Sequence, residues 1–133
     1  MSLPLCVPNV PAATLALTAG EVVKIDTGAV VVVTATTDNP LGIVWKDCAA
    51  GETPLVVQPG QMVTIEADFS GFSDGEVLGG TTAGALTDLT AVDITGIDIA
   101  TPAWSVCRVV SKLTAGSAIV WTDIQPIRGT NTP

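Results

Sequence analysis

The residues of this chain whose types and spacing could do chemistry begin with Asp26, Thr27 and Gly28, which lie between two valine-rich stretches. A carboxylate on a tight turn, paired with the same residue of a second chain, can share one proton and activate water for peptide-bond cleavage. The sequence contains no histidine, which excludes Ser-His-Asp triads, Cys-His pairs and histidine metal ligands. Asp26 is therefore the catalytic candidate to weigh.

The segment Ile25-Asp-Thr-Gly-Ala29 resembles the active-site tripeptide of retroviral-type aspartic peptidases. That family also has a later apolar-apolar-Gly segment that carries an acid or amide and leads into a helix. The nearest stretch here, Val77-Leu-Gly-Gly-Thr81, has neither an acid nor an amide. Because Asp-Thr-Gly also suits a turn between two strands, we favour a hairpin turn, with a dimeric peptidase using Asp26 as an alternative.

Two groups of acids are candidate metal ligands. Asp68, Asp74 and Glu76 share a glycine-rich stretch, and Asp93 and Asp98 flank a glycine. Their spacing does not match the calcium-loop pattern D-x-[DN]-x-[DN]-G, so solvated loop acids are the favoured interpretation. The cysteines are widely separated, without a C-x-x-C pair, which predicts free thiols in a reducing cytosol: Cys6, Cys48 and Cys107. We expect no metal, cofactor or catalytic site.

The charge of the chain indicates which partners it avoids. Thirteen acids against five bases give a net charge of −8. Such a surface repels phosphate backbones and anionic lipids, so neither nucleic acid nor membrane is an expected partner. No apolar run of about 18 residues is present to span a bilayer.

The composition predicts an all-β protein. The chain has 18 valines and 18 threonines, β-branched residues that suit pleated surfaces. Short apolar runs alternate with Gly, Pro, Asn and Asp turns, which predicts about nine short strands and no helix, as a small barrel, β-tulip-like or sandwich domain. We divide the chain into a proline-rich extended arm (1–14), a β domain (15–124) and a C-terminal tail (125–133).

The stretch from Pro40 to Val63 carries a further resemblance. It contains Leu41-Gly-Ile-Val44, Asp47-Cys-Ala-Ala-Gly-Glu52 and Val56-Val57 before Gly60. This order is similar to a recurring pattern of phage head decoration proteins, the capsid cement family. Upstream Gly20 to Gly28, downstream Phe72 to Leu78 and the closing Val106 to Val120 extend the likeness over about residues 15–124. Cys48 in place of alanine, an insert around 88–103 and the arm depart from the family pattern.

The resemblance implies a structural protein without enzymatic activity. Proteins of this family form β-barrel or β-tulip homotrimers that bind the major capsid protein on the outside of an expanded capsid and brace neighbouring capsomers. The expected location is then the virion exterior, after synthesis in the host cytoplasm. A generic β-sandwich binding module is a further alternative.

The arm has apolar side chains that suit contact with a capsid: Leu3, Leu5, Val7 and Val10. An extended arm of this kind can add a strand or an apolar strip to the edge of a partner. We expect deletion of residues 1–13 to leave a folded protein that no longer holds capsids together. Of Trp45, Trp104 and Trp121, at least two are expected to pack in the core and one is a candidate interface anchor.

Overall fold

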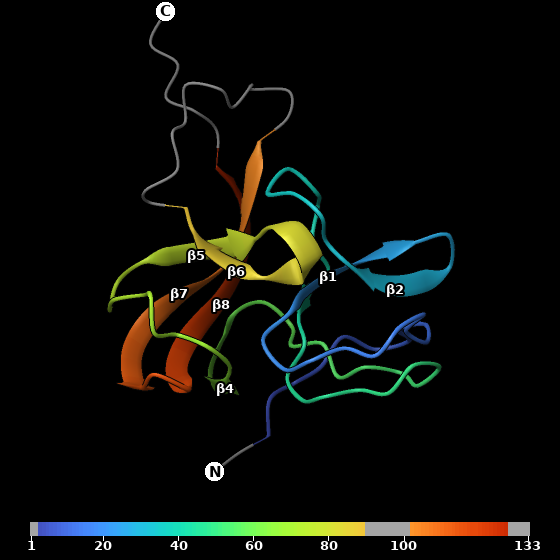
Figure 1. Ribbon diagram of the computed structural model, residues 1–133, viewed down its shortest axis with the longest axis horizontal. Helices are drawn as coiled ribbons and strands as arrows, with labels where there is room; N and C mark the ends of the chain where they lie inside the picture. The colour runs from blue at the N-terminus through green and yellow to red at the C-terminus, as the bar shows by residue number, and fades with distance from the viewer. Residues whose placement is uncertain (1–2, 90–101, 128–133) are drawn as a thin grey trace, which may run out of the picture.

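The computed structural model of the chain describes residues 3–89 and 102–127 (Figure 1). This part of the chain forms eight strands and one short 3-10 helix, so the predicted all-β class is confirmed. The elements are β1 (Val22–Asp26), β2 (Ala29–Val32), β3 (Gly42–Ile43), β4 (Gln61–Glu66), β5 (Val77–Gly80), η1 (Thr82–Gly84), β6 (Leu86–Asp88), β7 (Ala103–Thr114) and β8 (Ser117–Ile127).

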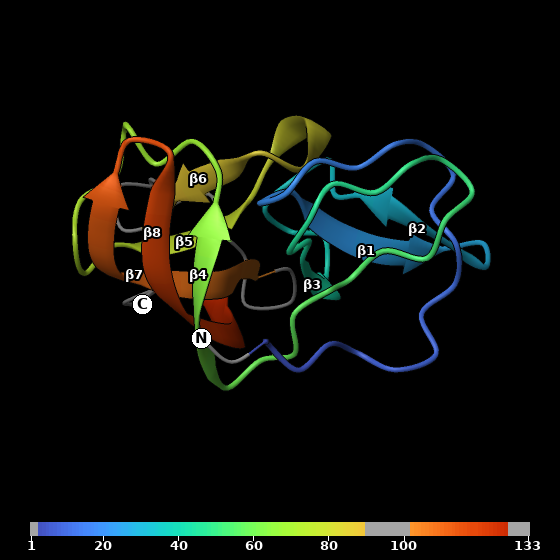
Figure 2. The same ribbon diagram turned by 90° about the horizontal axis from the view of Figure 1, so that it is seen from below.

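The strands form two antiparallel sheets that lie side by side along the long axis of the molecule (Figures 1 and 2). One sheet has the order β2-β1-β3, and the other has the order β4-β8-β7-β5-β6. The hairpin of β1 and β2 projects at the end of the molecule opposite the five-stranded sheet (Figure 1). Within the described residues the five-stranded sheet ends at β4 and β6, so it is not a closed barrel.

The β1–β2 hairpin confirms that Asp-Thr-Gly is a turn. Asp26 pairs with Ala29, which leaves Thr27 and Gly28 as a two-residue loop. Both loop residues have positive φ, 53° and 78°, as in the type I′ turns that match the twist of a hairpin. The valine-rich sequences on both sides then form the predicted strands.

The N-terminal arm lies on the body of its own chain. Val7 N–H donates to the Val56 carbonyl at 2.8 Å, and Ala13 forms a parallel bridge with Val30. Val10 and Ala13 are only 8% and 2% exposed, within a cluster of buried side chains from the three-stranded sheet and its loops. The arm is therefore docked on its own chain, with Val10 and Ala13 in the core.

A second buried cluster joins the two sheets. Its largest fully buried side chains include Phe69, Ile65 and Leu78, each 0% exposed. Gly80 allows the sheets to approach, because a Cβ at this position would lie 2.6 Å from both Val22 Cβ and Val33 Cγ2. The glycine pair in β5 thus serves packing between sheets.

The C-terminal hairpin is longer than predicted. Thr114 pairs with Ser117, so residues 114–117 form the turn between β7 and β8. Strand β8 continues through Gln125, Pro126 and Ile127, so this strand extends three residues past residue 124. Most of the predicted insert (90–101) and the rest of the tail (128–133) lie outside the described residues.

Asp38 holds the loop after β2 in place. Its Oδ2 accepts hydrogen bonds from the N–H of Thr34 at 2.8 Å and of Ala35 at 3.3 Å, and Lys24 Nζ lies 3.1 Å away. The bond from the Thr34 backbone, with smaller contributions from Lys24 and the Thr34 hydroxyl, lowers the pKa of Asp38 below its usual range, although partial burial opposes the shift. The carboxylate form is therefore the stabilising one.

We expect Asp38→Ala to lower the free energy of unfolding at pH 7 by about 1 kcal/mol, because several hydrogen bonds to one partly exposed carboxylate are lost. Since the pKa of Asp38 is lower in the folded state, its contribution is present above the unfolded pKa of about 3.9 and is lost as the pH falls through the folded value. Urea denaturation of the wild type and of Asp38→Ala, at pH 7 and in acid, measures this contribution to the free energy of unfolding. Asp26→Ala, at an exposed turn, is the control and should change the free energy of unfolding little. If Asp38→Ala lowers the free energy of unfolding equally at both pH values, the lowered pKa of Asp38 is contradicted.

Candidate functional site

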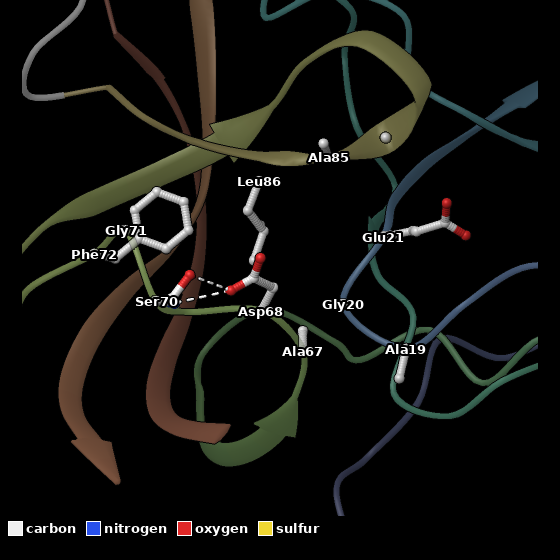
Figure 3. Close-up of a pocket in the computed structure, with 11 residues that line it drawn as sticks. Ala19, Gly20, Glu21, Ala67, Asp68, Ser70, Gly71, Phe72, Ala85 and Leu86 are labelled. Carbon is white, nitrogen blue, oxygen red and sulfur yellow. Dashed lines mark hydrogen bonds between the residues drawn. The ribbon is translucent and has the colours of Figure 1, made fainter. Parts of the chain in front are cut away.

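A cleft of about 380 Å³ lies where the two sheets meet (Figure 3). Three segments build it: the turn before β1, the loop after β4, and the connection from η1 to β6. Much of its wall is backbone and small side chains, while Phe72 and Leu86 contribute apolar surface.

Beside this cleft, the carboxylates of Asp68 and Glu21 each accept hydrogen bonds from a residue two or three positions away in the chain. Asp68 Oδ1 accepts bonds from the Ser70 hydroxyl at 2.6 Å and the Ser70 N–H at 3.0 Å, and these bonds lower the pKa of Asp68. Glu21 Oε1 accepts a bond from the Thr18 N–H at 2.6 Å, and its side chain points away from Asp68 (Figure 3). The two acids do not converge on a common point, so the cleft offers contact surface and no acid–base pair.

Asp26 lies at the exposed tip of the β1–β2 hairpin. Its Oδ1 accepts a hydrogen bond from the Thr27 hydroxyl at 3.0 Å. A peptidase of the shared-proton type requires two carboxylates to face each other across a two-fold axis. The second carboxylate would have to come from another chain, and the peptidase interpretation stays an alternative.

The predicted loop acids occupy separate places. Asp68 bonds Ser70 as above, whereas Asp74 Oδ1 accepts the Lys112 N–H at 2.8 Å. Glu76 Oε2 is shielded from solvent and has no hydrogen-bond partner among the described residues. Within residues 3–89 and 102–127, no three metal-ligating side chains come together. Asp93 and Asp98 lie outside the described residues.

The cysteines match the prediction of free thiols. Cys48 and Cys107 are buried and Cys6 is half-buried, and none forms a disulfide. Burial raises the pKa of Cys107 to about 12 and also raises the pKa of Cys6 and of Cys48. Because the thiolate is the reactive form, these protonated thiols are poor nucleophiles at neutral pH.

The four predicted capsid-contact residues fall into two pairs. Leu3 and Leu5 are 76% and 65% exposed. Val10 is buried, and Val7 packs against the same cluster. Only Leu3 and Leu5 therefore present large apolar surfaces to solvent, and the two valines hold the arm in place.

A surface that the sequence analysis missed lies on the outward face of the five-stranded sheet. Strand register places Met62, Trp121, Arg108 and Val77 in one row across β4, β8, β7 and β5. Met62 is 62% exposed and Arg108 is exposed, while Trp121 and Val77 are half-buried. A hollow of about 270 Å³ adjoins the row, bordered also by Asp123 and Gln125. The alternation of side chains from Gln61 to Glu66 places Met62 on one side of its strand, but it does not show which residues of other strands lie beside Met62.

No helix in the described part of the chain is long and apolar enough to cross a bilayer. No protein-family model and no curated protein matches this chain.

Proposed function

We propose that this chain is a structural virion protein that binds the outside of a phage capsid as a decoration or cement protein. In this role it contacts the major capsid protein and braces neighbouring capsomers. The proposal includes the homotrimeric state and the β-tulip-like architecture that the resemblance to capsid cement proteins implies. The two-sheet all-β domain and its acidic composition are compatible with such a protein.

The observation that carries the proposal is that hydrogen bonds to Gln58 and Gln61 fix the backbone of Leu5. Gln61 Oε1 accepts the Leu5 N–H at 2.7 Å, and Gln61 Nε2 donates to the Leu5 carbonyl at 2.8 Å. Gln58 N–H donates to the same carbonyl at 2.9 Å. The backbone is fixed, yet the Leu5 side chain is 65% exposed. An apolar group that is already ordered loses less entropy on binding, which suits adhesion to a partner surface.

The test combines Leu3→Ser with Leu5→Ser and measures sedimentation of the protein with expanded capsids of the cognate phage. We expect the wild-type protein to co-sediment and the double variant to bind at least about a hundredfold more weakly, because each of the two buried leucines is worth about 1.5–3 kcal/mol. Cryo-electron microscopy of the decorated capsids would locate the arm.

Leu15→Ser is the matched control, because Leu15 is 73% exposed in another loop. It should bind capsids like the wild type. Thermal denaturation should show that all variants fold. If the wild-type protein does not sediment with capsids, or if the double variant binds as well as the wild type, the proposal is wrong.

A further inference from the structure

Strand β4 leaves one edge of the five-stranded sheet without a backbone partner. At its two ends the chain bonds to β8 or to the turn before it. Ala67 N–H donates to the Gly116 carbonyl at 3.1 Å, and Gln61 N–H donates to the Thr122 hydroxyl at 3.1 Å. Because bonding to one neighbour alternates along an antiparallel strand, three residues between them turn their N–H and carbonyl groups away from β8: Met62, Thr64 and Glu66. Within residues 3–89 and 102–127, these groups have no backbone hydrogen-bond partner.

The other sheet edges of the described chain are short or covered. Strand β6, at the far end of the same sheet, has three residues. In the smaller sheet, Val30 N–H on β2 donates to the Ala12 carbonyl of the arm at 3.1 Å, and Val57 N–H donates to the Ile43 carbonyl on β3 at 2.9 Å. Proteins usually protect an open edge with lysine, proline or a bulge. Strand β4 pairs regularly with β8 and has none of these, and its one charged residue, Glu66, lies at its end.

The outward side chains beside this edge are apolar. Met62 is 62% exposed and lies opposite the half-buried Trp121, while Thr64 lies opposite the half-buried Ile119. The solvent face of an antiparallel sheet usually carries polar residues. A strand added to the edge would place every second side chain next to Met62 and Thr64, and would cover apolar surface that solvent now reaches.

The edge adjoins the surface that the proposed function assigns to the capsid. Strand β4 begins at Gln61, whose side chain makes two hydrogen bonds to the Leu5 backbone. The arm therefore passes beside this end of β4 (Figure 2). The exposed Leu5 contacts Gln61, and the exposed Met62 follows Gln61 in the chain. A capsid protein held at Leu5 is thus beside the start of the open edge.

We propose that an extended segment of the capsid protein adds to β4 as a further strand of the sheet, with its backbone bonded to Met62 and Thr64. Main-chain hydrogen bonds give this kind of strand addition its affinity, and alternate side chains give it specificity. The inference rests on the proposed function and deepens it, because it names a second contact and the conformation of the capsid segment that makes it.

The test is Thr64→Pro, which removes an edge N–H without breaking a bond to β8. Proline is tolerated on an edge strand where the N–H faces solvent, so we expect the variant to fold. It should bind expanded capsids of the cognate phage about tenfold more weakly, or worse, in co-sedimentation, because one hydrogen bond is lost and the ring obstructs the incoming strand. Thr64→Val is the matched control, because it keeps the N–H and a β-branched side chain. It should bind like the wild type.

Hydrogen exchange gives a second measurement, which needs no variant. In the wild-type protein, the backbone amides of Gln61–Glu66 should exchange more slowly on capsids than in the free protein, because the amides of Met62 and Thr64 become bonded. This measurement decides the question if thermal denaturation shows that Thr64→Pro does not fold.

The outcomes separate this inference from the proposed function. If the wild-type protein does not sediment with capsids, the proposed function is wrong and strand addition is wrong with it. If the wild type binds, but Thr64→Pro binds equally well, Thr64→Val is as weak as Thr64→Pro, or exchange in β4 is unchanged on capsids, only strand addition is wrong. If sedimentation velocity of the protein alone shows self-association that Thr64→Pro abolishes, the edge pairs with a second copy, and the capsid is not its partner.

Discussion

Deletion of residues 1–13 is expected to lower the free energy of unfolding by roughly 3–5 kcal/mol. The deletion removes the buried Val10 and Ala13 and exposes the apolar cluster that they cover. It also leaves the Val56 and Glu52 carbonyls without the N–H groups of Val7 and Ala13. Burial of a valine contributes about 1.5 kcal/mol or more and each lost backbone bond about 1 kcal/mol, partly offset because fewer residues must be ordered. Urea denaturation measures the loss.

This result would differ from the expectation that the arm's composition alone suggests, namely that the shortened chain remains folded. A chain lacking only residues 1–4 is the control, because it keeps Leu5, Val7 and Val10. Its stability should stay within about 0.5 kcal/mol of the full chain, as for other changes at exposed positions. If the chain without residues 1–13 is as stable as the full chain, the contacts with Val56 and Val30 do not hold the arm on the body of the protein in solution.

Gly80→Ala is expected to cost about 3 kcal/mol, the upper end of the range for overpacking a core. The new methyl group would lie 2.6 Å from Val22 Cβ and from Val33 Cγ2. Both neighbours are β-branched, fully buried side chains that cannot rotate away. The two sheets must therefore separate at this point, which the midpoint of thermal or urea denaturation would report.

Gly71→Ala is the matched control for this substitution. A Cβ at Gly71 would have no atom within 4 Å, so the stability of the Gly71→Ala protein should stay close to that of the wild type. A Gly80→Ala protein as stable as the Gly71→Ala protein would mean that the sheets do not pack at this distance.

Local features of the fold could be predicted from the sequence because their causes are local. The turns at Thr27-Gly28 and at 114–117 follow from residues that accept turn geometry. The alternation from Gln61 to Glu66 indicates a strand with one covered face, and Ile65 is indeed buried while Met62 is exposed. These signals are confirmed where the structure describes them.

Pairing between distant strands could not be predicted. Strand β4 pairs with β8, with Met62 opposite Trp121, and nothing within either segment specifies that register. The outward row around Arg108 therefore had no signal in the sequence. For the same reason, Gly80 was visible only as one of two adjacent glycines, since Val22 and Val33 lie far from it in the chain.

The arm shows the same limit for the candidate site. Its prolines and apolar residues predict an extended, adhesive segment, but Leu5 and Val10 are equally apolar in the sequence. Val10 is buried because the arm crosses the three-stranded sheet there, while Leu5 stays exposed beside Gln61. Which side chains remain available to a partner depends on bridges to Val57 and Val30, which no local pattern encodes.

The ribosome makes β7 and β8 after the other three strands of the five-stranded sheet, although these two strands hold that sheet together. Strand β4 has β8 as its partner, and β5 joins the sheet through β7. As these earlier strands leave the ribosome, their apolar side chains, including Ile65 and Leu78, have no sheet to cover them. Long-range pairing of this kind forms slowly and exposes the chain to aggregation in the meantime. The five-stranded sheet therefore assembles only after β8 has been made, and a chain that stops before Ser117 leaves β4 without its partner.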